Sequence, residues 1–272
     1  MQETIFLAVL QGIAEFLPIS SSGHLVIAQN LLNCGESGVR LEVCLHVGTL
    51  LSVVVFYRSA IARLLGGCIL PGCDARERRD AWSFAGKLFL SSLPAVAFYF
   101  CCGKFIDDFF DSAKLTGAML IFTGFVLFAT KFARPGARNV RWLDALLMGA
   151  AQAVALIPGV SRSGMTLATA KYSGVDAGKS AEFSFLMSAP LIVGGLVLEL
   201  AKAFSQAGGA DGAAPAAEAV HRSWPELAIG GIVSAVVGYF ALKILVATLK
   251  GRHFWLFGVY CIACGAFAIY KG

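Results

Sequence analysis

Two short polar segments, at residues 19–23 and 160–164, hold the side chains of this chain that are best suited to chemistry. The first reads ISSSG and the second VSRSG, so both follow the pattern apolar-Ser-x-Ser-Gly. Each segment interrupts a stretch that is otherwise apolar enough to enter a bilayer. Non-helical backbone at membrane depth is tolerated only where it is buried in protein or lines a wet cavity. Paired broken segments in the two halves of a duplicated membrane protein indicate a binding site.

Glu15 lies shortly before the first polar segment, inside an apolar stretch. A carboxylate at the centre of a membrane helix costs about 2.5–3.5 kcal/mol on insertion scales, so an acid at that depth is expected to have a function. Gln11 is four residues earlier and lies on the same helical face. We expect both side chains to line the site. A hydrogen bond that only holds helices together is the alternative for each.

The first polar segment combines three serines with a histidine. Pro18 ends one helix, and Ser20, Ser21 and Ser22 can cap the next one. Their hydroxyls and the free amides of the helix start would form an anion site. His24 lies in the first turn of that helix, and an imidazole in an apolar segment needs a partner. Capping alone would explain the serines, but it does not explain His24.

The second polar segment places Arg162 between Ser161 and Ser163, ahead of Gly164. A buried guanidinium requires an anion, and its planar fork suits phosphate. A structural ion pair with Glu15 is the alternative, and such a pair could also be the resting state that a phosphate displaces. We expect one cavity with two helix starts, hydroxyls, an imidazole, a carboxylate and a guanidinium. This set of groups indicates phosphate handling, and the apolar wall indicates a ligand with an apolar tail.

The composition excludes an ordinary soluble domain. The chain has 272 residues, of which 57% are hydrophobic and 14% charged, and its mean hydropathy is +0.74. This suits one polytopic membrane unit. The net charge of +5 is modest, and the basic residues cluster in short loops. They therefore indicate membrane topology, and not a nucleic-acid surface.

The hydropathy pattern predicts an all-α membrane protein with six transmembrane helices. A spanning helix needs about 20 apolar residues. Two further regions, each split by a polar segment, consist of pieces too short to cross, and we expect re-entrant helix-turn-helix pairs there. The predicted spans are 42–57, 82–102, 115–131, 181–201, 226–248 and 254–271. The predicted re-entrant pairs are 4–17 with 23–32, and 142–157 with 164–173.

Each half therefore contains one re-entrant pair and three spans. Because three is odd, the second half is inserted upside down, which gives an inverted-topology repeat within one integral membrane domain, 1–272. Repeat one covers about 1–131 and repeat two about 142–271. The loops 58–81, 131–141, 171–180 and 249–253 hold 13 of the 22 Lys and Arg residues. By the positive-inside rule these loops face the cytoplasm, so both termini face out. His46 and Thr49 are expected to line or brace the cavity, and packing in the core is the alternative for both.

Two long motifs resemble those of a known family. Residues 11–24, QGIAEFLPISSSGH, resemble the signature (E/Q)xxxEFLP(I/V)SSxGH, and residues 158–164, PGVSRSG, resemble PGxSRSG. Both signatures belong to undecaprenyl-diphosphatases of the BacA type, and EFSFLMSAP at 182–190 is similar to a third family stretch. The resemblance covers essentially the whole chain. It implies a phosphatase of the bacterial inner membrane that converts undecaprenyl diphosphate to undecaprenyl phosphate, the lipid carrier for peptidoglycan and envelope glycans. It also implies bacitracin resistance and a site that faces the periplasm.

The resemblance also assigns roles to residues. By motif position the functional residues are Gln11, Glu15, Ser21, His24, Ser161 and Arg162. We expect catalysis by Glu15, Ser21, His24 and Arg162, and substrate binding by Gln11, Ser20, Ser22, Ser161, Ser163 and Gly164. The nucleophile is Ser21, His24 or a metal-bound water.

The expected cofactor is a divalent cation, Mg²⁺ or Ca²⁺, held by Glu15. Because position 11 is Gln, a site with two carboxylates is not available there. The expected partners are a polyprenyl diphosphate lipid and membrane lipids, without nucleic acid, and homodimer formation is left open. The alternative function is a lipid flippase or transporter of the inverted-repeat type.

Overall fold

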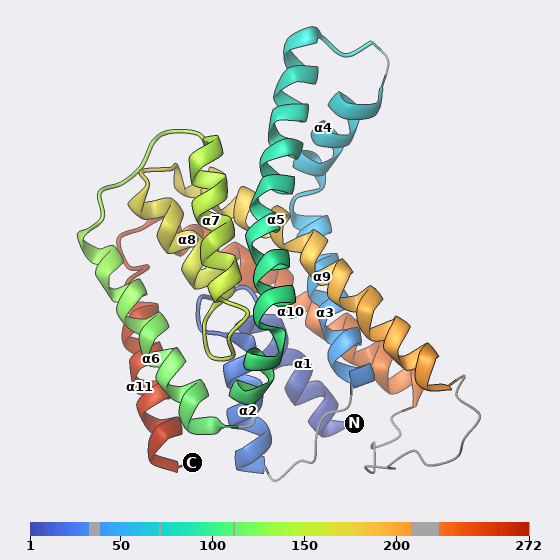
Figure 1. Cartoon of the computed structure of the whole chain (residues 1–272), viewed down its shortest axis with the longest axis vertical. Helices are drawn as coiled ribbons and strands as arrows, with labels where there is room; N and C mark the ends of the chain where they lie inside the picture. Colours follow the sequence, from blue (N-terminus) through green and yellow to red (C-terminus); the bar gives the residue numbers. More distant parts are fainter. Residues whose placement is uncertain (33–38, 71, 111, 208–222, 272) are drawn as a thin grey trace.

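The structure is a computed structural model that describes residues 1–32, 39–70, 72–110, 112–207 and 223–271, and Figure 1 shows it as a bundle of helices. The described residues form α-helices, a short 3-10 turn and two isolated β-bridges. The helices are α1 (Gln2–Ala14), α2 (Ser21–Leu32), α3 (Val39–Phe56), α4 (Arg58–Ile69), α5 (Ala75–Phe110), α6 (Ala113–Ala129), η1 (Thr130–Phe132), α7 (Trp142–Val154), α8 (Arg162–Tyr172), α9 (Ala177–Ala207), α10 (Trp224–Lys250) and α11 (Leu256–Lys271).

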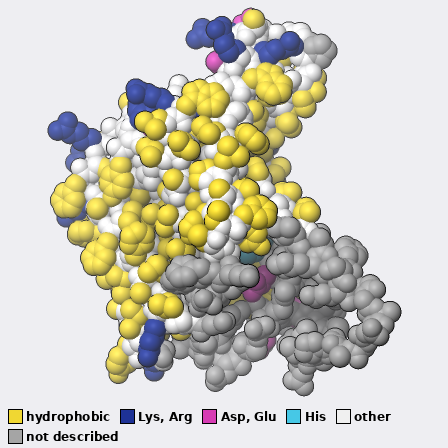
Figure 2. Space-filling model, in the orientation of Figure 1, with side chains coloured by type: hydrophobic (Ala, Val, Ile, Leu, Met, Phe, Trp, Pro, Cys, Tyr) yellow, Lys and Arg dark blue, Asp and Glu magenta, His cyan; other side chains and the backbone are white. Residues whose placement is uncertain are grey.

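Several helices are long and apolar enough to cross a membrane. Among the described residues these are Ala75–Gly103, Ala113–Phe132 and Trp224–Lys250, and the bent pair α3–α4 is a fourth candidate. Figure 2 shows hydrophobic side chains over much of the described surface, with Lys and Arg gathered near the ends of the molecule. A lipid-facing surface has this distribution, because only the ends of the helices reach water and headgroups. The chain is therefore an all-helical, multi-pass membrane protein.

The prediction that residues 58–81 form a loop is wrong. Residues Arg58–Ile69 form α4, which turns by 75° from α3, and α5 already begins at Ala75. Charged residues lower the hydropathy of residues 58–81, so the hydropathy pattern alone does not predict a membrane-spanning helix there. The helix is instead stabilised by packing, because a Cβ at Gly67 would lie 2.6 Å from the Cβ of Ala81. With 36 residues, α5 is about 54 Å long, and its first turns project with α4 from the body (Figure 1).

Small residues bring α6 and α11 into backbone contact. A Cβ added to Gly258 would lie 2.5 Å from the carbonyl oxygen of Gly124 and 2.5 Å from the amide nitrogen of Phe128. Interfaces between membrane helices are enriched in small residues for this reason, since dispersion and not hydrophobic burial must hold the helices together. This helix pair forms one side of the bundle (Figure 1).

We expect Gly258→Ala to destabilise the protein. The new methyl group forces α6 and α11 apart, and overpacking of this kind costs about 1–3 kcal/mol. Gly194→Ala is the matched control, because a Cβ there meets nothing within 4 Å; relief of glycine's entropy makes it neutral or stabilising by about 0.5–1 kcal/mol. Thermal unfolding in detergent measures both. Equal midpoints for the two variants would refute the packing argument.

The two polar segments connect the broken helix pairs and lie against each other. Residues 15–20 separate α1 from α2, and residues 155–161 separate α7 from α8. The Oγ of Ser163 donates to the carbonyl oxygen of Leu17 over 3.2 Å. A Cβ on Gly164 would lie 3.4 Å from the Cβ of Pro18, which shows how closely the segments approach. Below them, the rings of Phe16 and Phe185 pack edge to face at 5.5 Å in the main apolar core.

Candidate active site

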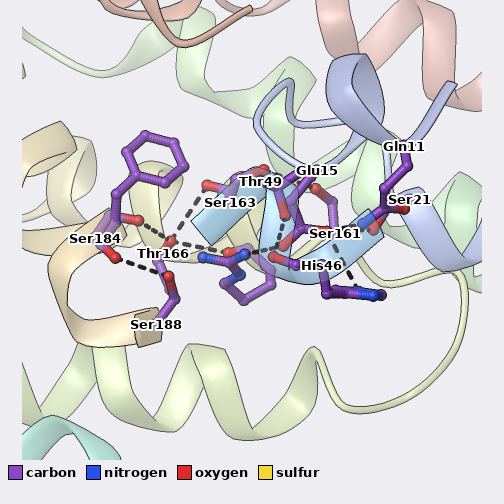
Figure 3. Close-up of polar contacts among 12 residues, drawn as sticks. Gln11, Glu15, Ser21, His46, Thr49, Ser161, Ser163, Thr166, Ser184 and Ser188 are labelled. Atoms are coloured by element: carbon purple, nitrogen blue, oxygen red, sulfur yellow. Dashed lines mark hydrogen bonds and ion pairs between the residues drawn. The ribbon is translucent and has the colours of Figure 1, made fainter. Parts of the chain in front are cut away.

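Several polar side chains bind the buried carboxylate of Glu15. One carboxylate oxygen, Oε2, accepts from Gln11 Nε2 at 3.0 Å and from Ser21 Oγ at 2.9 Å. The other, Oε1, accepts from Nη2 of Arg162, across 147 residues of sequence. The side chain is almost fully buried, and Figure 3 shows it at the centre of the labelled polar residues. A buried charge is stable only when it is paired and hydrogen-bonded, and Glu15 satisfies both conditions.

Arg162 has a guanidinium arm without a partner. It is the first residue of α8, and its side chain is 18% exposed. While Nη2 binds Glu15, the buried Nη1 has no hydrogen-bond partner within the described chain. An unsatisfied buried donor on a charged group is costly and calls for an explanation. An anion that enters between the two segments would supply the missing acceptor, and phosphate oxygens match the fork of a guanidinium.

The first polar segment is held in a strained turn. Ser20 has φ of 69°, and it is the one non-glycine residue with positive φ in the described ranges. Its Oγ accepts from the amide of Gly23 at 3.3 Å and lies 3.4 Å from the Oγ of Ser22. The turn places Ser20 as a cap for α2 and directs Ser21 toward Glu15. A non-glycine residue in this conformation costs about 1–3 kcal/mol, and such strain clusters at functional sites.

The second polar segment is capped in a similar way. Ser161 is the N-cap of α8, and its Oγ accepts from the amide of Gly164 at 3.1 Å and lies 3.3 Å from Ser163 Oγ. Its own amide donates to Thr123 Oγ1 at 3.1 Å. Ser161 thus caps α8, whereas Ser163 bonds across to the carbonyl oxygen of Leu17. Thr123, in the middle of α6, anchors this segment, and no local sequence pattern singles it out.

His24 lies apart from the Glu15 network. Its Nδ1 is 2.9 Å from the carbonyl oxygen of Ser20, and its Nε2 is 2.9 Å from the hydroxyl of Tyr260. The two rings are stacked with centroids 5.6 Å apart. Among the described residues, the hydrogen bonds of His24 therefore lead to Ser20 and Tyr260, and not to Ser21 or Glu15. Tyr260 is a partner that the sequence analysis missed, because it lies 236 residues away on α11.

A second imidazole is closer to the carboxylate. His46 Nε2 lies 3.9 Å from Glu15 Oε2, and its Nδ1 is 2.8 Å from the carbonyl oxygen of Glu42. Thr49 Oγ1 donates to the carbonyl oxygen of His46 at 2.9 Å. His46 therefore lies beside the Glu15 carboxylate, while the hydroxyl of Thr49 bonds within α3, and the expectation that both line or brace a cavity stays a prediction. Away from Glu15, Thr166 and Ser184 share a hydrogen bond of 2.7 Å that ties α8 to α9 (Figure 3).

Fold and site together define the class: a multi-pass helical membrane protein whose two broken helix pairs bury one guanidinium–carboxylate pair between them. The family can be named as well. A sequence model of the family "Bacitracin resistance protein BacA" matches residues 4–267, and the chain belongs to this family.

Relatives match along their whole length. An undecaprenyl-diphosphatase from Desulfatibacillum aliphaticivorans is 37% identical, over 97% of this chain and 96% of the relative. Proteins of the same name from Desulfosudis oleivorans and Korarchaeum cryptofilum are 34% and 32% identical. The first covers 98% of this chain and 97% of the relative, and the second covers 97% and 96%. The family resemblance drawn from the two motifs is therefore confirmed.

Proposed function

We propose that the protein hydrolyses undecaprenyl diphosphate to undecaprenyl phosphate and inorganic phosphate, and so recycles the lipid carrier of peptidoglycan and envelope glycan synthesis. Its family and the names of its relatives support this function. The observation that carries it is the Glu15–Arg162 pair with its unsatisfied guanidinium arm. Bacitracin resistance follows from the same activity, because that antibiotic sequesters the diphosphate substrate.

For the membrane layout we propose six spans and two re-entrant pairs in an inverted repeat, within one domain. The pairs α1–α2 and α7–α8 would be re-entrant, which the close contact between their polar segments supports. Basic residues gather near the α4–α5 connection and near the loop before α7 (Figure 2). By the positive-inside rule that end faces the cytoplasm. The chain would then lie in a bacterial inner membrane with both termini outside and the site open to the periplasm.

On substrate binding, the Arg162 guanidinium would exchange the Glu15 carboxylate for the diphosphate. The diphosphate enters between the two polar segments while its polyprenyl tail stays in lipid. Its oxygens take both arms of the Arg162 guanidinium, including the arm that has no hydrogen-bond partner among the described residues. The amide groups at the starts of α2 and α8 add partial positive charge, as helix N-termini do toward phosphates. Gln11, Ser20, Ser22, Ser161, Ser163 and Gly164 shape and support this binding surface.

For the chemical step we propose Ser21 as the nucleophile. Its hydroxyl already donates to Glu15 Oε2 over 2.9 Å, which is the geometry of a nucleophile and its base. Once Arg162 has turned to the phosphate, Glu15 is free to accept the Ser21 proton. Oγ attacks the terminal phosphorus, the bond to the bridging oxygen breaks, and undecaprenyl phosphate leaves with that oxygen. A water then hydrolyses the phosphoserine, which gives inorganic phosphate and restores Ser21. His24 as nucleophile and attack by a metal-bound water are the alternatives.

We also propose a divalent cation, Mg²⁺ or Ca²⁺, at Glu15. The oxygens available there fit a hard cation: the carboxylate itself, and Gln11 Oε1, which is buried and has no hydrogen-bond partner in the described structure. Such ions are usually bound through one or two carboxylates plus substrate phosphates. The cation would neutralise phosphate charge. We expect EDTA to lower phosphate release by the wild type and added Mg²⁺ or Ca²⁺ to restore it; an unchanged rate in EDTA would contradict the cofactor proposal.

The experiment that tests the function is phosphate release by purified protein in detergent. Wild type should release inorganic phosphate from undecaprenyl diphosphate, and Glu15→Gln should be slower by roughly 10²-fold, the usual contribution of a general base. Glu77→Gln is the matched control, since Glu77 is exposed in the first turn of α5, and it should keep the wild-type rate. A flippase or transporter would release no phosphate. The enzyme function would therefore be refuted if the wild type released none.

A further inference from the structure

A charged cavity lies at the opposite end of α8 from Arg162. Its volume is about 540 Å³, and it is lined by the loop from Arg134 to Arg138, by Lys171 and Tyr172 at the C-terminal end of α8, and by Gly174 just after that helix. Lys171 follows Arg162 by nine residues, so the two lie about 13 Å apart along the helix. The cavity is therefore separate from the Glu15 site, and it contains no residue of the two motifs at 11–24 and 158–164 or of the proposed reaction.

Backbone pairing joins the loop that lines one side of this cavity to the segment after α8 on the other side. Gly136 bridges Asp176, and Arg138 bridges Val175. The amide of Asp176 donates to the carbonyl oxygen of Arg138 over 2.9 Å. The Arg138 guanidinium binds Asp144 in α7 and the carbonyl oxygen of Ser173. The loop before α7 is thereby fixed to the turn after α8.

Two cations of the cavity are not neutralised by any acid in the described ranges. Its lining residues include three cations and no acid. Asp144 compensates Arg138, whereas Arg134 and Lys171 form no ion pair with any described residue. Because the C-terminal end of a helix carries partial negative charge, the attraction for an anion must come from these two side chains. Lys171 is also positioned by the ring of Phe254, at 5.6 Å from its Nζ.

Exposed aromatic side chains flank the same cavity. Phe132, two residues before Arg134, is 78% exposed, and Tyr172 in the cavity wall is 49% exposed while its hydroxyl donates to the carbonyl oxygen of Val126. Nearby, Lys131 Nζ lies 4.7 Å from the centroid of the Trp255 ring. Aromatic and basic residues at one level mark the boundary between hydrocarbon and headgroups. A ligand here would meet cations at its head and apolar rings along its tail.

We propose that this cavity binds the headgroup of an anionic glycerophospholipid from the surrounding bilayer. Basic pockets between helices at a membrane surface bind such headgroups. The lipid phosphate would lie between Arg134 and Lys171, and its acyl chains would run along Phe132. A free anion would contact the two cations but would make no contact with the exposed ring of Phe132. A bound lipid would stabilise the C-terminal end of α8, the helix that begins at Arg162.

The test measures lipid binding by native mass spectrometry, with phosphatidylglycerol added to protein in phosphatidylcholine-containing micelles. The variant is Arg134→Gln combined with Lys171→Gln. Each basic residue near an anionic surface contributes roughly fivefold in affinity, so the double variant should bind phosphatidylglycerol roughly 25-fold more weakly. Arg76→Gln combined with Arg79→Gln is the matched control, because both residues are exposed on α5 and the charge change is the same. It should bind like the wild type.

Further measurements identify the ligand and test whether a loss of binding results from misfolding. Lys171→Arg keeps the charge and should keep affinity, which separates loss of charge from loss of fold. Phosphatidylcholine should not compete with phosphatidylglycerol, and glycerol phosphate should compete only weakly. The proposal is overturned if the double variant binds phosphatidylglycerol as the wild type does, or if the control loses affinity equally. Equal binding of glycerol phosphate would reduce the site to one for a free anion.

Discussion

Ser21→Ala should release inorganic phosphate from undecaprenyl diphosphate roughly 10⁴-fold more slowly than the wild type, since removing a nucleophile eliminates the covalent route. The hydroxyl of Ser21 is the one that points at the Glu15 carboxylate, at 2.9 Å. Release of phosphate by purified protein, followed over hours, has the dynamic range for this measurement.

Ser22→Ala is the control for Ser21. Ser22 is the next residue on the same turn, and among the described residues its Oγ has one hydrogen-bond contact, with Ser20 at 3.4 Å. Its loss should cost less than roughly tenfold, as expected for a weak neutral hydrogen bond. Full turnover in Ser21→Ala would assign the nucleophile to His24 or to water. Trapping experiments would then separate these two, because attack by His24 forms an acid-labile phosphohistidine and direct attack by water forms no phosphoenzyme.

Arg162→Met should lower phosphate release by roughly 10³-fold, which is the upper range for the loss of one preorganised donor to developing charge. The variant removes both guanidinium arms, the one bound to Glu15 and the one without a partner. It also leaves the Glu15 charge uncompensated, and breaking a buried pair costs about 3–5 kcal/mol of stability. Activity must therefore be compared at a temperature well below the unfolding midpoint of the variant.

Two further variants make the arginine result specific. Arg162→Lys keeps a positive charge but loses the planar fork, so its rate should fall between those of the wild type and Arg162→Met. Arg76→Met removes an exposed arginine at the start of α5 and should leave the rate unchanged. If Arg162→Lys were as active as the wild type, recognition would depend on charge alone, and the paired-fork geometry proposed for the phosphate would be wrong.

The meeting of Glu15 and Arg162 could be predicted from sequence because both residues are expensive in an apolar segment. Each needs a partner of opposite charge, and the repeated polar segments indicate where the partner lies. The contact between the segments, through Ser163 and Leu17, follows the same logic. The predicted broken pairs also match α1–α2 and α7–α8 closely in their limits.

Other parts of the site were not predictable from local pattern. Tyr260 and Thr123 are ordinary residues of apolar helices, and their roles arise only when α11 and α6 pack beside the polar segments. His24 was expected to face the anion site, but its two ring nitrogens turn to Ser20 and Tyr260. The helix α4 was missed for a related reason: tertiary packing at Gly67 stabilises it, and hydropathy does not report that contact.

The serines of the two polar segments have two different roles. Ser20 and Ser161 each accept from an amide three residues later, which is the geometry of a helix cap. Ser21 instead donates to a carboxylate. A sequence pattern that reads Ser-x-Ser cannot separate these roles, because the choice depends on which hydroxyl the turn directs toward Glu15. The positive φ of Ser20 provides that direction in the structure.

The most direct test of the account is a double-mutant cycle on phosphate release, with wild type, Glu15→Gln, Arg162→Met and the combined variant. If the two side chains act on one diphosphate in one pocket, their effects are strongly non-additive, and the combined variant is about as slow as the slower single variant. If the losses multiply, so that the combined variant is slower by the product of the two single effects, Glu15 and Arg162 act independently and the shared phosphate site is refuted.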